Sequence, residues 1–592
     1  MKPVGQSVVA QTGRSVPAAE NIDLPVDYYL TNFQQLIDFV SEAYIDLLSI
    51  DEKAFATSFT ALSSPARMLY VRLLCRTHNV FRLDKLNYPE IGDLEPAAAE
   101  LSVAGFVALN PVLPVDQACM LFTKPELVKH IEAHTDWSTN GKSLKPMKRA
   151  ELEGIWQTLY GACAPELNVQ NEEQGVPSVN IGALTDAIVV NRSEHFDVFR
   201  LCFFGNLYQD MTDFVLRDLG LMRYENYAID DTTRPFNTRV QLDAHLDYFG
   251  ISASLPEFKE LTVEAMLSVE ASLPDAVDNH LERRLDRLRI ALARQLERID
   301  ELQVADKLYR KCARSPSRER RVRILMKQNN WQSAFMLCQE SLVSTINDAE
   351  AQVLSGLAAR IAQKCNETFD DLWAYSPPLE RVQLTNSGDS VETQAAEHYC
   401  QYGSCFYTEN ALIDGVFGLA FWDVIFAPTR GAFFNPFQIA PADFHEPEFS
   451  IVRRDMIKDK FAELKKPGVL KRQVDLVYQS KQGIANPMVS WRYLTQELLD
   501  LAMQRIPLDH WFAMFNRLLL DTRSHRSGLP DLIVFPDESS ACESGYRLVE
   551  VKGPGDSLQK NQIHWMRFFA EHGIDHAVCH VTWCNPDSTN DE

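Results

Sequence analysis

Two apolar segments near the C-terminus, each joined to charged residues, constrain the fold of this chain most. The first, residues 532–535, directly follows Asp531, and the second, residues 546–551, contains Glu550 and leads into Lys552. Because side chains alternate along a β-strand, Glu550 and Lys552 lie on one face of the second segment and its valines lie on the other. We therefore predict two neighbouring strands that bring an Asp, a Glu and a Lys into one small volume.

An acid inside a buried strand needs a partner for its charge. Burying a carboxylate without one is costly, so we expect Glu550 to face a cation. Asp531 and Glu550 offer hard oxygen ligands, which favour Mg²⁺ or Mn²⁺, and Lys552 can orient a water or offset charge on a phosphate. The pattern indicates a metal-dependent phosphodiesterase that cuts nucleic acid. The alternative is a turn Asp followed by a surface Glu–Lys ion pair on an edge strand.

The segment after this motif completes an α/β domain. A Gly-Pro pair ends the second strand, and Asp556 or Ser557 is expected to cap a helix that runs to about His572. Residues 577–581 are apolar and β-branched enough to form a further strand. We therefore predict a C-terminal α/β domain with a mixed sheet, residues 380–592.

Length and composition describe a protein of several domains. The 592 residues exceed what one hydrophobic core supports, and 46% hydrophobic with 23% charged residues is usual for globular proteins. The sequence has no run of about 18 uncharged apolar residues, so we expect no membrane span. Its twelve cysteines are scattered without the spacing of a metal site, which favours a reducing intracellular compartment.

The N-terminal two-thirds of the chain is mainly α-helical by its apolar spacing. After a disordered lead-in (1–22), residues 23–115 have the helices and short ribbon of a winged helix. Residues 116–256 contain two short helices around a Gly-Lys turn, as in a SAP-type DNA-binding motif, and residues 257–379 resemble a tetratricopeptide-type helical region. The alternatives are a plain packing module, a generic helical hairpin and a helical spacer, respectively.

A net charge of −23 does not exclude nucleic-acid binding, because local patches decide it. Lys and Arg cluster at residues 307–327 and 453–472; the alternative for each cluster is a solvated helix face. We predict phosphate contacts by seven basic residues of the SAP-like and helical regions, namely Lys142, Lys145, Lys148, Arg149, Arg318, Arg320 and Arg321.

Several stretches of the chain together resemble one known family. The segments HRSGLPDLIVF (525–535) and YRLVEVKGPGDSLQKNQIHWM (546–566) resemble a VRR-NUC domain of the PD-(D/E)xK nuclease superfamily. With LIDGVFGLAFWDVIF (412–426) and residues 67–106, the chain as a whole resembles the Fanconi-associated nuclease family in its bacterial form. The resemblance implies a 5′-flap endonuclease and 5′ to 3′ exonuclease that acts in the repair of DNA interstrand crosslinks.

The resemblance also implies roles for individual residues. It assigns the catalytic centre to Lys552, Asp531, Glu550 and Gln562, and it assigns one or two Mg²⁺ or Mn²⁺ ions to Glu409, Asp531, Glu550 and the backbone carbonyl of Val551. Glu409 stands just before an apolar helix. Its alternative role is that of a helix N-terminal acid favoured by the helix dipole.

Three functions stay open at this point. The first is the repair nuclease, whose partner is DNA with a 5′ flap or a branch. The second is a nuclease that resolves junctions or acts as a restriction-type enzyme, and the third is a non-catalytic scaffold that binds DNA. We expect no membrane partner and a cytoplasmic, nucleoid-associated location, or a nuclear one in a eukaryote; partner proteins stay unassigned.

Overall fold

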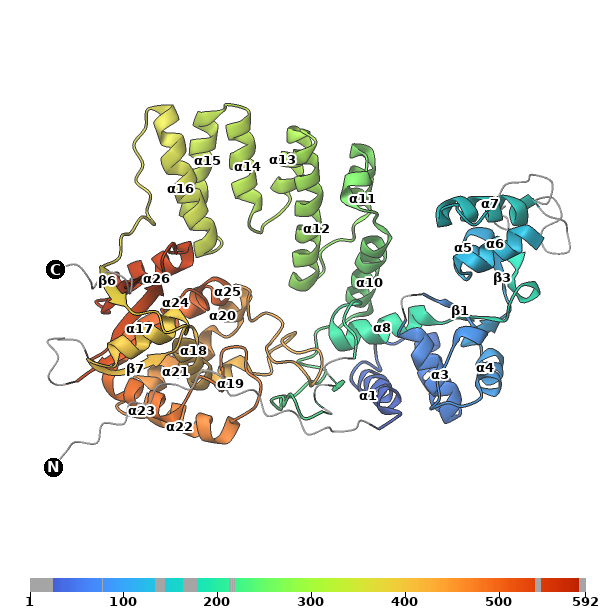
Figure 1. Ribbon diagram of the computed structural model, residues 1–592, viewed down its shortest axis with the longest axis horizontal. Coiled ribbons are helices and arrows are strands. Elements are labelled where there is room, and N and C mark those ends of the chain that lie inside the picture. The colour runs from blue at the N-terminus through green and yellow to red at the C-terminus, as the bar shows by residue number, and fades with distance from the viewer. Residues whose placement is uncertain are drawn as a thin grey trace, which may run out of the picture. The chain divides into compact units, whose positions relative to one another are not determined.

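The computed structural model describes residues 25–76, 78–133, 144–162, 178–211, 214–215, 217, 219–537 and 545–584. The chain forms two compact units, Ile22–Asp218 and a second unit that begins at Leu219 (Figure 1). Each unit buries apolar clusters of its own. Within the described ranges, no helix is long and apolar enough to cross a membrane.

The N-terminal unit begins with helices around a small sheet. The helices are α1 (Tyr28–Ala43), α2 (Ile50–Ala61), α3 (Ser64–Leu74) and α4 (Leu94–Val103). The sheet has the order β1 (Val80–Arg82), β5 (Ala187–Val190), β2 (Val107–Leu109). Ser49 caps α2 in a capping box, and Ser63 caps α3 with Pro in the first turn. The interior is aromatic, with Phe33, Phe55, Phe59, Tyr70 and Phe106 fully buried.

A second group of elements is inserted between β2 and β5. It consists of β3 (Val112–Pro114), α5 (Val115–Met120), α6 (Lys124–Ala133), α7 (Arg149–Ala162) and β4 (Ser178–Asn180) around Phe122 and Trp156. β5 then returns to pair with both β1 and β2, and α8 (Ser193–Phe204) packs on α1 and α2. A strand and a helix from far along the chain therefore complete the first group of elements.

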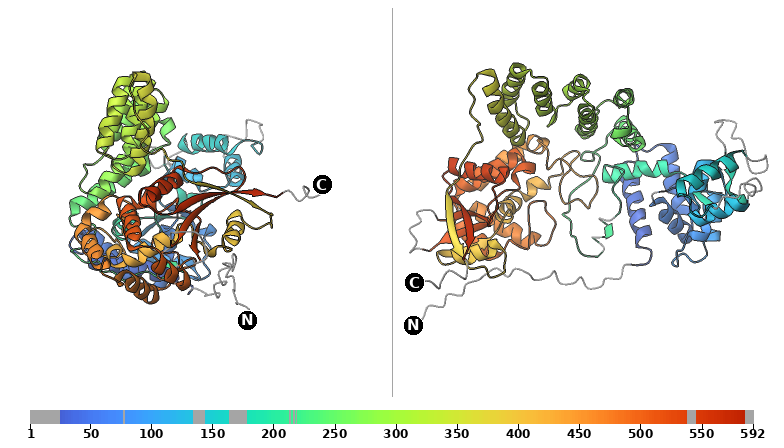
Figure 2. Two further views of the ribbon diagram at one scale, coloured as in Figure 1. Left: turned by 90° about the vertical axis from the view of Figure 1, so that its left-hand side faces the viewer. Right: turned by 45° about the horizontal axis from the view of Figure 1, so that its top comes forward.

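The second unit opens with a row of helices. They are α10 (Arg239–Ser254), α11 (Val263–Ser272), α12 (Asn279–Arg298), α13 (Leu302–Arg310), α14 (Ser317–Lys327), α15 (Trp331–Val343) and α16 (Asp348–Cys365). Figures 1 and 2 show them lying side by side. The helical character predicted for residues 257–379 is confirmed. The row begins earlier than predicted, because Ala244 of α10 packs against Leu281 and Leu285 of α12.

The rest of this unit is an α/β domain on a five-stranded mixed sheet. The strand order is β6 (Leu379–Leu384), β10 (His576–Trp583), β9 (Arg547–Lys552), β8 (Leu532–Pro536), β7 (Gly403–Tyr407). β10 runs parallel to β6 and β9, and β8 runs antiparallel to β7 and β9. The mixed sheet predicted for the C-terminal domain is confirmed.

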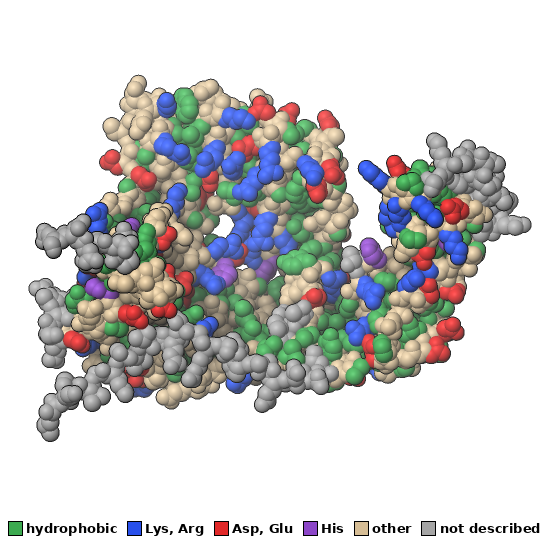
Figure 3. Space-filling model, in the orientation of Figure 1, with side chains coloured by type: hydrophobic (Ala, Val, Ile, Leu, Met, Phe, Trp, Pro, Cys, Tyr) green, Lys and Arg blue, Asp and Glu red, His purple; other side chains and the backbone are tan. Residues whose placement is uncertain are grey.

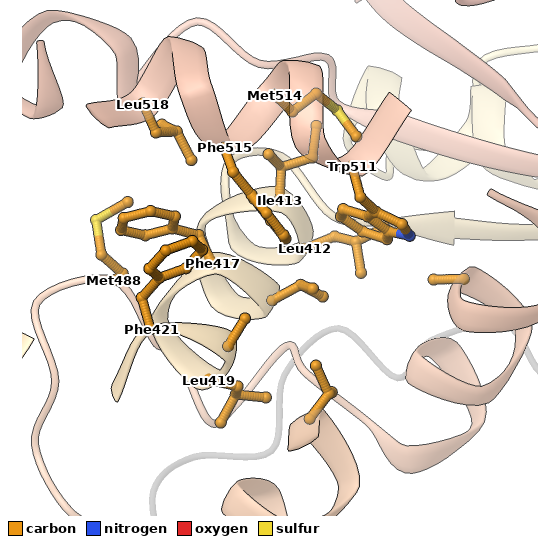
Figure 4. Packing of buried hydrophobic residues seen from close by; sticks show 14 of the residues in the cluster. Leu412, Ile413, Phe417, Leu419, Phe421, Met488, Trp511, Met514, Phe515 and Leu518 are labelled. Carbon is orange, nitrogen blue, oxygen red and sulfur yellow. The ribbon is translucent and has the colours of Figure 1, made fainter. Parts of the chain in front are cut away.

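Helices cover both faces of this sheet. On one face, Ala395 and Tyr399 of α17 (Val391–Tyr399) join Val549 and Val551 in an apolar cluster. The other face meets a larger core, part of which is drawn in Figure 4, where Phe417 and other aromatic side chains pack. The helices of that side are α18 (Ala411–Ala420), α19 (Trp422–Ile425), α20 (Glu448–Val452), α21 (Arg454–Leu464), α22 (Val469–Lys481), α23 (Gln496–Arg505), α24 (Leu508–Leu520), α25 (Thr522–His525) and α26 (Lys560–Glu571).

The helix after the motif begins later than predicted. α26 starts at Lys560, and Gln559 is its N-cap in a capping box with Gln562. Asp556 instead accepts a hydrogen bond from the backbone N–H of Gly553 at 3.0 Å and closes the turn after β9. The predicted helix cap at Asp556 is wrong, because the Asp556 carboxylate is used within the turn and α26 takes Gln559 as its N-cap.

We predict that Gly403→Ala lowers the free energy of unfolding by about 2–3 kcal/mol. Gly403 opens β7 with φ +156°, and a Cβ there would collide with the carbonyl oxygen of Phe535 on β8. Gly388→Ala is the matched control, since Gly388 has φ +91° with open space around its Cβ position; we expect it to cost about 1 kcal/mol. Equal losses in denaturant titrations would show that crowding by β8 contributes nothing.

Candidate active site

Asp531 and Glu550 meet where β8 and β9 pair. Asp531 precedes β8, Glu550 lies in β9, and the pairing of Leu532 with Val549 sets the two acids next to each other. The backbone N–H of Val551 donates to Asp531 Oδ2 at 2.8 Å. The structure therefore brings together the two acids that the alternating pattern placed in one volume.

Glu550 is a buried acid with one contacted oxygen and one uncontacted oxygen. Its exposed fraction is 1%. Lys552 Nζ lies 2.7 Å from Glu550 Oε1, and Gln562 Nε2 donates to the same oxygen at 2.5 Å. Burial, and then the charge of Asp531, raise the pKa of Glu550 to about 7. Glu550 Oε2 is buried without a hydrogen-bond partner, which leaves it available to a cation.

Asp531 is held by backbone groups but remains costly to ionise. Burial raises its pKa to about 6, although the N–H of Val551 and the charge of Lys552 act in the opposite direction. Glu392 and Glu409 add to the upward shift. Glu392, in the first turn of α17, is an acidic neighbour that sequence reasoning missed. The signal that could have found it is Ser390, which caps the start of that helix.

Glu409 occupies the turn between β7 and α18. The backbone N–H groups of Thr408 and Glu409 both donate to the carbonyl oxygen of Asp531, at 2.8 and 3.0 Å. Glu409 adopts φ +41°, and its Oε2 accepts a hydrogen bond from the Tyr407 hydroxyl at 2.9 Å. The turn is thus fastened to the start of β8, and the exposed side chain of Glu409 lies beside the buried pair.

The donor set fits a hard divalent cation. Asp531 and Glu550 supply carboxylate oxygens in a water-poor setting, and the unpartnered oxygen of Glu550 lacks only a positive partner. Among the described residues, no three His, Cys, Asp or Glu side chains are already grouped as a metal site. Two acids are in place, and Glu409 stands next to them with its carboxylate held by Tyr407.

The Gly-Leu-Pro segment before Asp531 explains how the loop reaches the site. Gly528 has φ +86°, and a Cβ there would lie 2.8 Å from the side chain of Asn561 on α26. The N–H of Leu529 donates to the side chain of Asn410 at 3.2 Å. The loop therefore passes tightly between the start of α26 and the turn that carries Glu409, where a larger residue than Gly has no room.

The basic residues predicted to contact phosphate divide into two groups. In α14, Arg318 binds the buried Glu350, Arg320 binds Glu297 and Arg321 binds Asp306. Their guanidinium groups hold helices together in this structure, and contact with phosphate stays a prediction for them. Lys and Arg side chains nevertheless gather over the helical row on the face seen in Figure 3.

The SAP-like basic residues are placed differently. Lys145 and Lys148 are exposed, and so is Arg149, which pairs with Glu153 one helical turn later at 2.6 Å. Lys142 lies outside the described residues. For these residues, contact with phosphate stays a prediction.

We predict that Arg318→Ala lowers the free energy of unfolding by about 3 kcal/mol. The substitution leaves Glu350, whose side chain is 0% exposed, without its cation. Arg360→Ala on α16 is the control, because Arg360 is exposed. Urea denaturation measures stability, and fluorescence anisotropy measures DNA affinity. A variant that keeps its stability but binds DNA more weakly would contradict the structural role and support phosphate contact by Arg318.

We predict that, in EDTA, Glu550→Gln is more stable than the wild type above neutral pH. The pKa of Glu550, raised to about 7, means that the folded state holds a proton more tightly than the unfolded chain. The stability from this proton is present at low pH and is lost as the pH rises through that value. The advantage of the variant should therefore grow between about pH 5 and pH 8, to on the order of 2 kcal/mol.

Thermal unfolding across that pH range checks this expectation. Added Mn²⁺ should raise the melting temperature of the wild type and leave that of Glu550→Gln almost unchanged, since the ion stabilises the state it binds. Melting curves of the two proteins that stay parallel at every pH would contradict the shifted pKa.

Comparison with known proteins places this site in a family. A model of the VRR-NUC domain matches residues 465–583, and a model described as the HTH domain of FAN1 matches residues 27–108. The Fanconi-associated nuclease 1 homolog of Pseudomonas aeruginosa is 34% identical over 567 residues, which cover 94% of this chain and 96% of that protein.

Solved structures agree with the sequence comparison. The crystal structure of paFAN1 bound to DNA with a 2-nucleotide 5′ flap and a gap matches with a TM-score of 0.75 and 32% identity, covering 97% of this chain and 100% of that chain. The complex with a 1-nucleotide flap matches with the same TM-score and identity over 95% of this chain. Nucleases of the PD-(D/E)xK type generally use divalent metal ions. The chain belongs to the Fanconi-associated nuclease family and is a structure-specific DNA nuclease, a phosphodiester hydrolase with a VRR-NUC domain.

Proposed function

We propose that this nuclease cuts DNA at 5′ flaps, trims it in the 5′ to 3′ direction and acts in the repair of interstrand crosslinks, with Mg²⁺ or Mn²⁺ as its metal. The observation that carries the proposal is the pair of the half-buried Asp531 and the buried Glu550, with Lys552 beside them. Support for the flap substrate comes from the similarity to paFAN1, which was crystallised with 5′-flap DNA.

The metal would be held by carboxylates that the fold already groups. Asp531 and Glu550 are the ligands from the paired strands, Glu409 is the ligand from the turn, and the carbonyl of Val551 completes the set we propose. When bound, the ion lowers the pKa of a water and offsets negative charge on the phosphate. The preference for Mg²⁺ or Mn²⁺ follows from a ligand set made of oxygens alone.

Lys552 and Gln562 prepare the site for the phosphate. Both contact Glu550 Oε1, so both fix the direction in which the carboxylate presents its other oxygen. The Lys552 side chain is 11% exposed, so its ammonium is largely shielded from bulk water. From its place beside Glu550, the ammonium of Lys552 would orient the attacking water or stabilise charge that develops on the phosphate.

We predict that Lys552→Ala reduces the rate of cutting by about 10²–10³-fold and leaves DNA binding largely intact. Asp531→Ala should lose metal-dependent cutting with an unchanged circular dichroism spectrum. Lys364→Ala, an exposed lysine at the end of α16, is the control. The assay uses end-labelled 5′-flap, 3′-flap, four-way-junction and plain duplex DNA, with Mn²⁺, Mg²⁺ or EDTA.

The outcomes separate the candidate functions. Metal-dependent cutting of the 5′ flap, lost with Asp531→Ala, supports the proposal and its site together. Preferential cutting of the four-way junction indicates a resolvase instead. Binding without cutting in either metal leaves a scaffold. Normal cutting by Lys552→Ala removes the role given to that lysine.

A further inference from the structure

A pocket of about 320 Å³ opens on the other side of the turn that carries Glu409. One wall is formed by that turn and the first turn of α18, with Tyr407, Glu409 and Asp414. The other wall is formed by the segment before α23, which includes Ser490 and Tyr493. The pocket thus shares Glu409 with the nuclease centre but lies outside the Asp531–Glu550 pair.

Asp414 is not among the residues of the catalytic centre, and one oxygen of its carboxyl group has no hydrogen-bond partner in the described part of the chain. Its exposed fraction is 6%, it lines the pocket, and its Oδ1 is buried without a hydrogen bond. Burial raises the pKa of Asp414 well above its usual range, against the opposing charge of Arg526 at the pocket rim. A buried polar group left in this state is expensive, and a ligand that hydrogen-bonds to it would remove the cost.

Two glycines of α18 allow a neighbouring segment to approach the helix closely beside the pocket. A Cβ on Gly415 would lie 2.9 Å from the side chain of Leu494, and one on Gly418 would lie 2.7 Å from Val489. The absence of these side chains lets the segment from Asn486 to Leu494 lie directly on α18. That close approach buries Asp414 beneath the segment and sets Tyr493 across from Glu409.

The chemistry of the lining fits a nucleobase. A neutral carboxyl group carries an O–H donor beside a carbonyl acceptor, as an amide carries N–H beside C=O, and base edges present such donor and acceptor pairs. Tyr493 is 42% exposed, and its ring has Tyr407 at its edge and Arg492 over one face. Bases outside a duplex stack on aromatic side chains of this kind.

A metal ion fits this pocket less well than a base does. Burial raises the pKa of Asp414 and so disfavours the charged carboxylate that a cation would need, and the positive charge of Arg526 acts on the same group. A cation would have to displace the proton of Asp414 and approach Arg526. An uncharged, planar, hydrogen-bonding ligand needs neither change.

We propose that the pocket of Asp414 and Tyr493 receives one base of the cut strand, next to the scissile phosphate. This inference rests on the proposed function, because the strand reaches the pocket by passing Glu409. The base must leave its stack, which costs least in a single-stranded flap or gap. The subsite holds the strand in register for cutting. The enzyme should therefore cut faster when the nucleotide at that one position carries its base.

Abasic substitution tests the subsite. A set of 5′-flap substrates carries one abasic site, placed in turn at each nucleotide near the cleaved bond, and single-turnover rates are measured with Mn²⁺. For the wild type, we expect base removal at one position to slow cutting by about tenfold, the loss of a stacked base. Asp414→Leu and Tyr493→Leu should each slow cutting of the intact substrate by a similar factor and should no longer respond to base removal at that position.

Two further variants control the experiment. Asp414→Asn keeps a donor beside an acceptor and should keep the position dependence. Tyr402→Leu changes a comparably exposed tyrosine outside the pocket, 50% exposed, and should keep the wild-type pattern. If Asp414→Leu fails to fold, as judged by circular dichroism, Tyr493→Leu carries the test by itself.

The outcomes distinguish this subsite from the nuclease activity. The subsite is overturned if the wild type cuts every abasic substrate at the rate of the intact one. It is also overturned if base removal slows Asp414→Leu and Tyr493→Leu as much as it slows the wild type, so that the two losses multiply. In both cases metal-dependent cutting of the 5′ flap by the wild type still stands. A wild type that cuts no substrate with any metal overturns the proposed function and the subsite with it.

Discussion

Two acids whose charge the protein only partly neutralises are the feature on which the rest of the nuclease domain depends. The pairing of β8 with β9 forces Asp531 and Glu550 together, and burial raises the pKa of both. Lys552 and Gln562 act on one oxygen of Glu550 and leave the other without a partner. The domain is therefore less stable in its metal-free form than a similar domain with an apolar pair, and it gains stability from the ion that it uses.

Such a pair needs a rigid frame, and the frame is built from backbone. Two N–H groups of the turn before α18 hold the carbonyl oxygen of Asp531, while Val551 N–H holds its carboxylate. Glu409 adopts φ +41° to reach this position, a conformation that non-glycine residues seldom adopt and that a framework must enforce. The backbone strain therefore lies at Glu409, the third acid beside the Asp531–Glu550 pair.

Local patterns predicted the parts of the protein that local interactions determine. The alternation around Glu550 predicted a strand with its valines on one face, and Val549 and Val551 do pack together against α17. The apolar run after Asp531 became β8, fully buried. These features follow from the alternation of side chains along a strand and from their burial, and both can be read within a single segment. The mixed sheet and the grouping of Asp531, Glu550 and Lys552 could therefore be predicted from the sequence.

Other features depend on partners that lie far away in the chain. β5 pairs with β1 across more than a hundred residues, and nothing in either segment names the other. Arg318 belongs to a strongly basic run, yet Glu350 on another helix neutralises it. The start of α26 was set by a turn that Asp556 closes and by a cap at Gln559. The role of a basic run or of a capping residue can therefore be assigned only once the group that it contacts is known.

α18 shows how one helix can serve an apolar core and a polar site at once. Ile413 and Phe417 point into the core drawn in Figure 4. Gly415 and Gly418 let a neighbouring segment pack closely on the helix. Asp414 lies on the same helix and lines the polar pocket. A carboxyl group shut away from water keeps its proton and can donate a hydrogen bond, whereas Glu409, exposed five residues earlier, can present a charge to a metal. The two acids differ in exposure, and burial disfavours the charged form of Asp414 alone of the two.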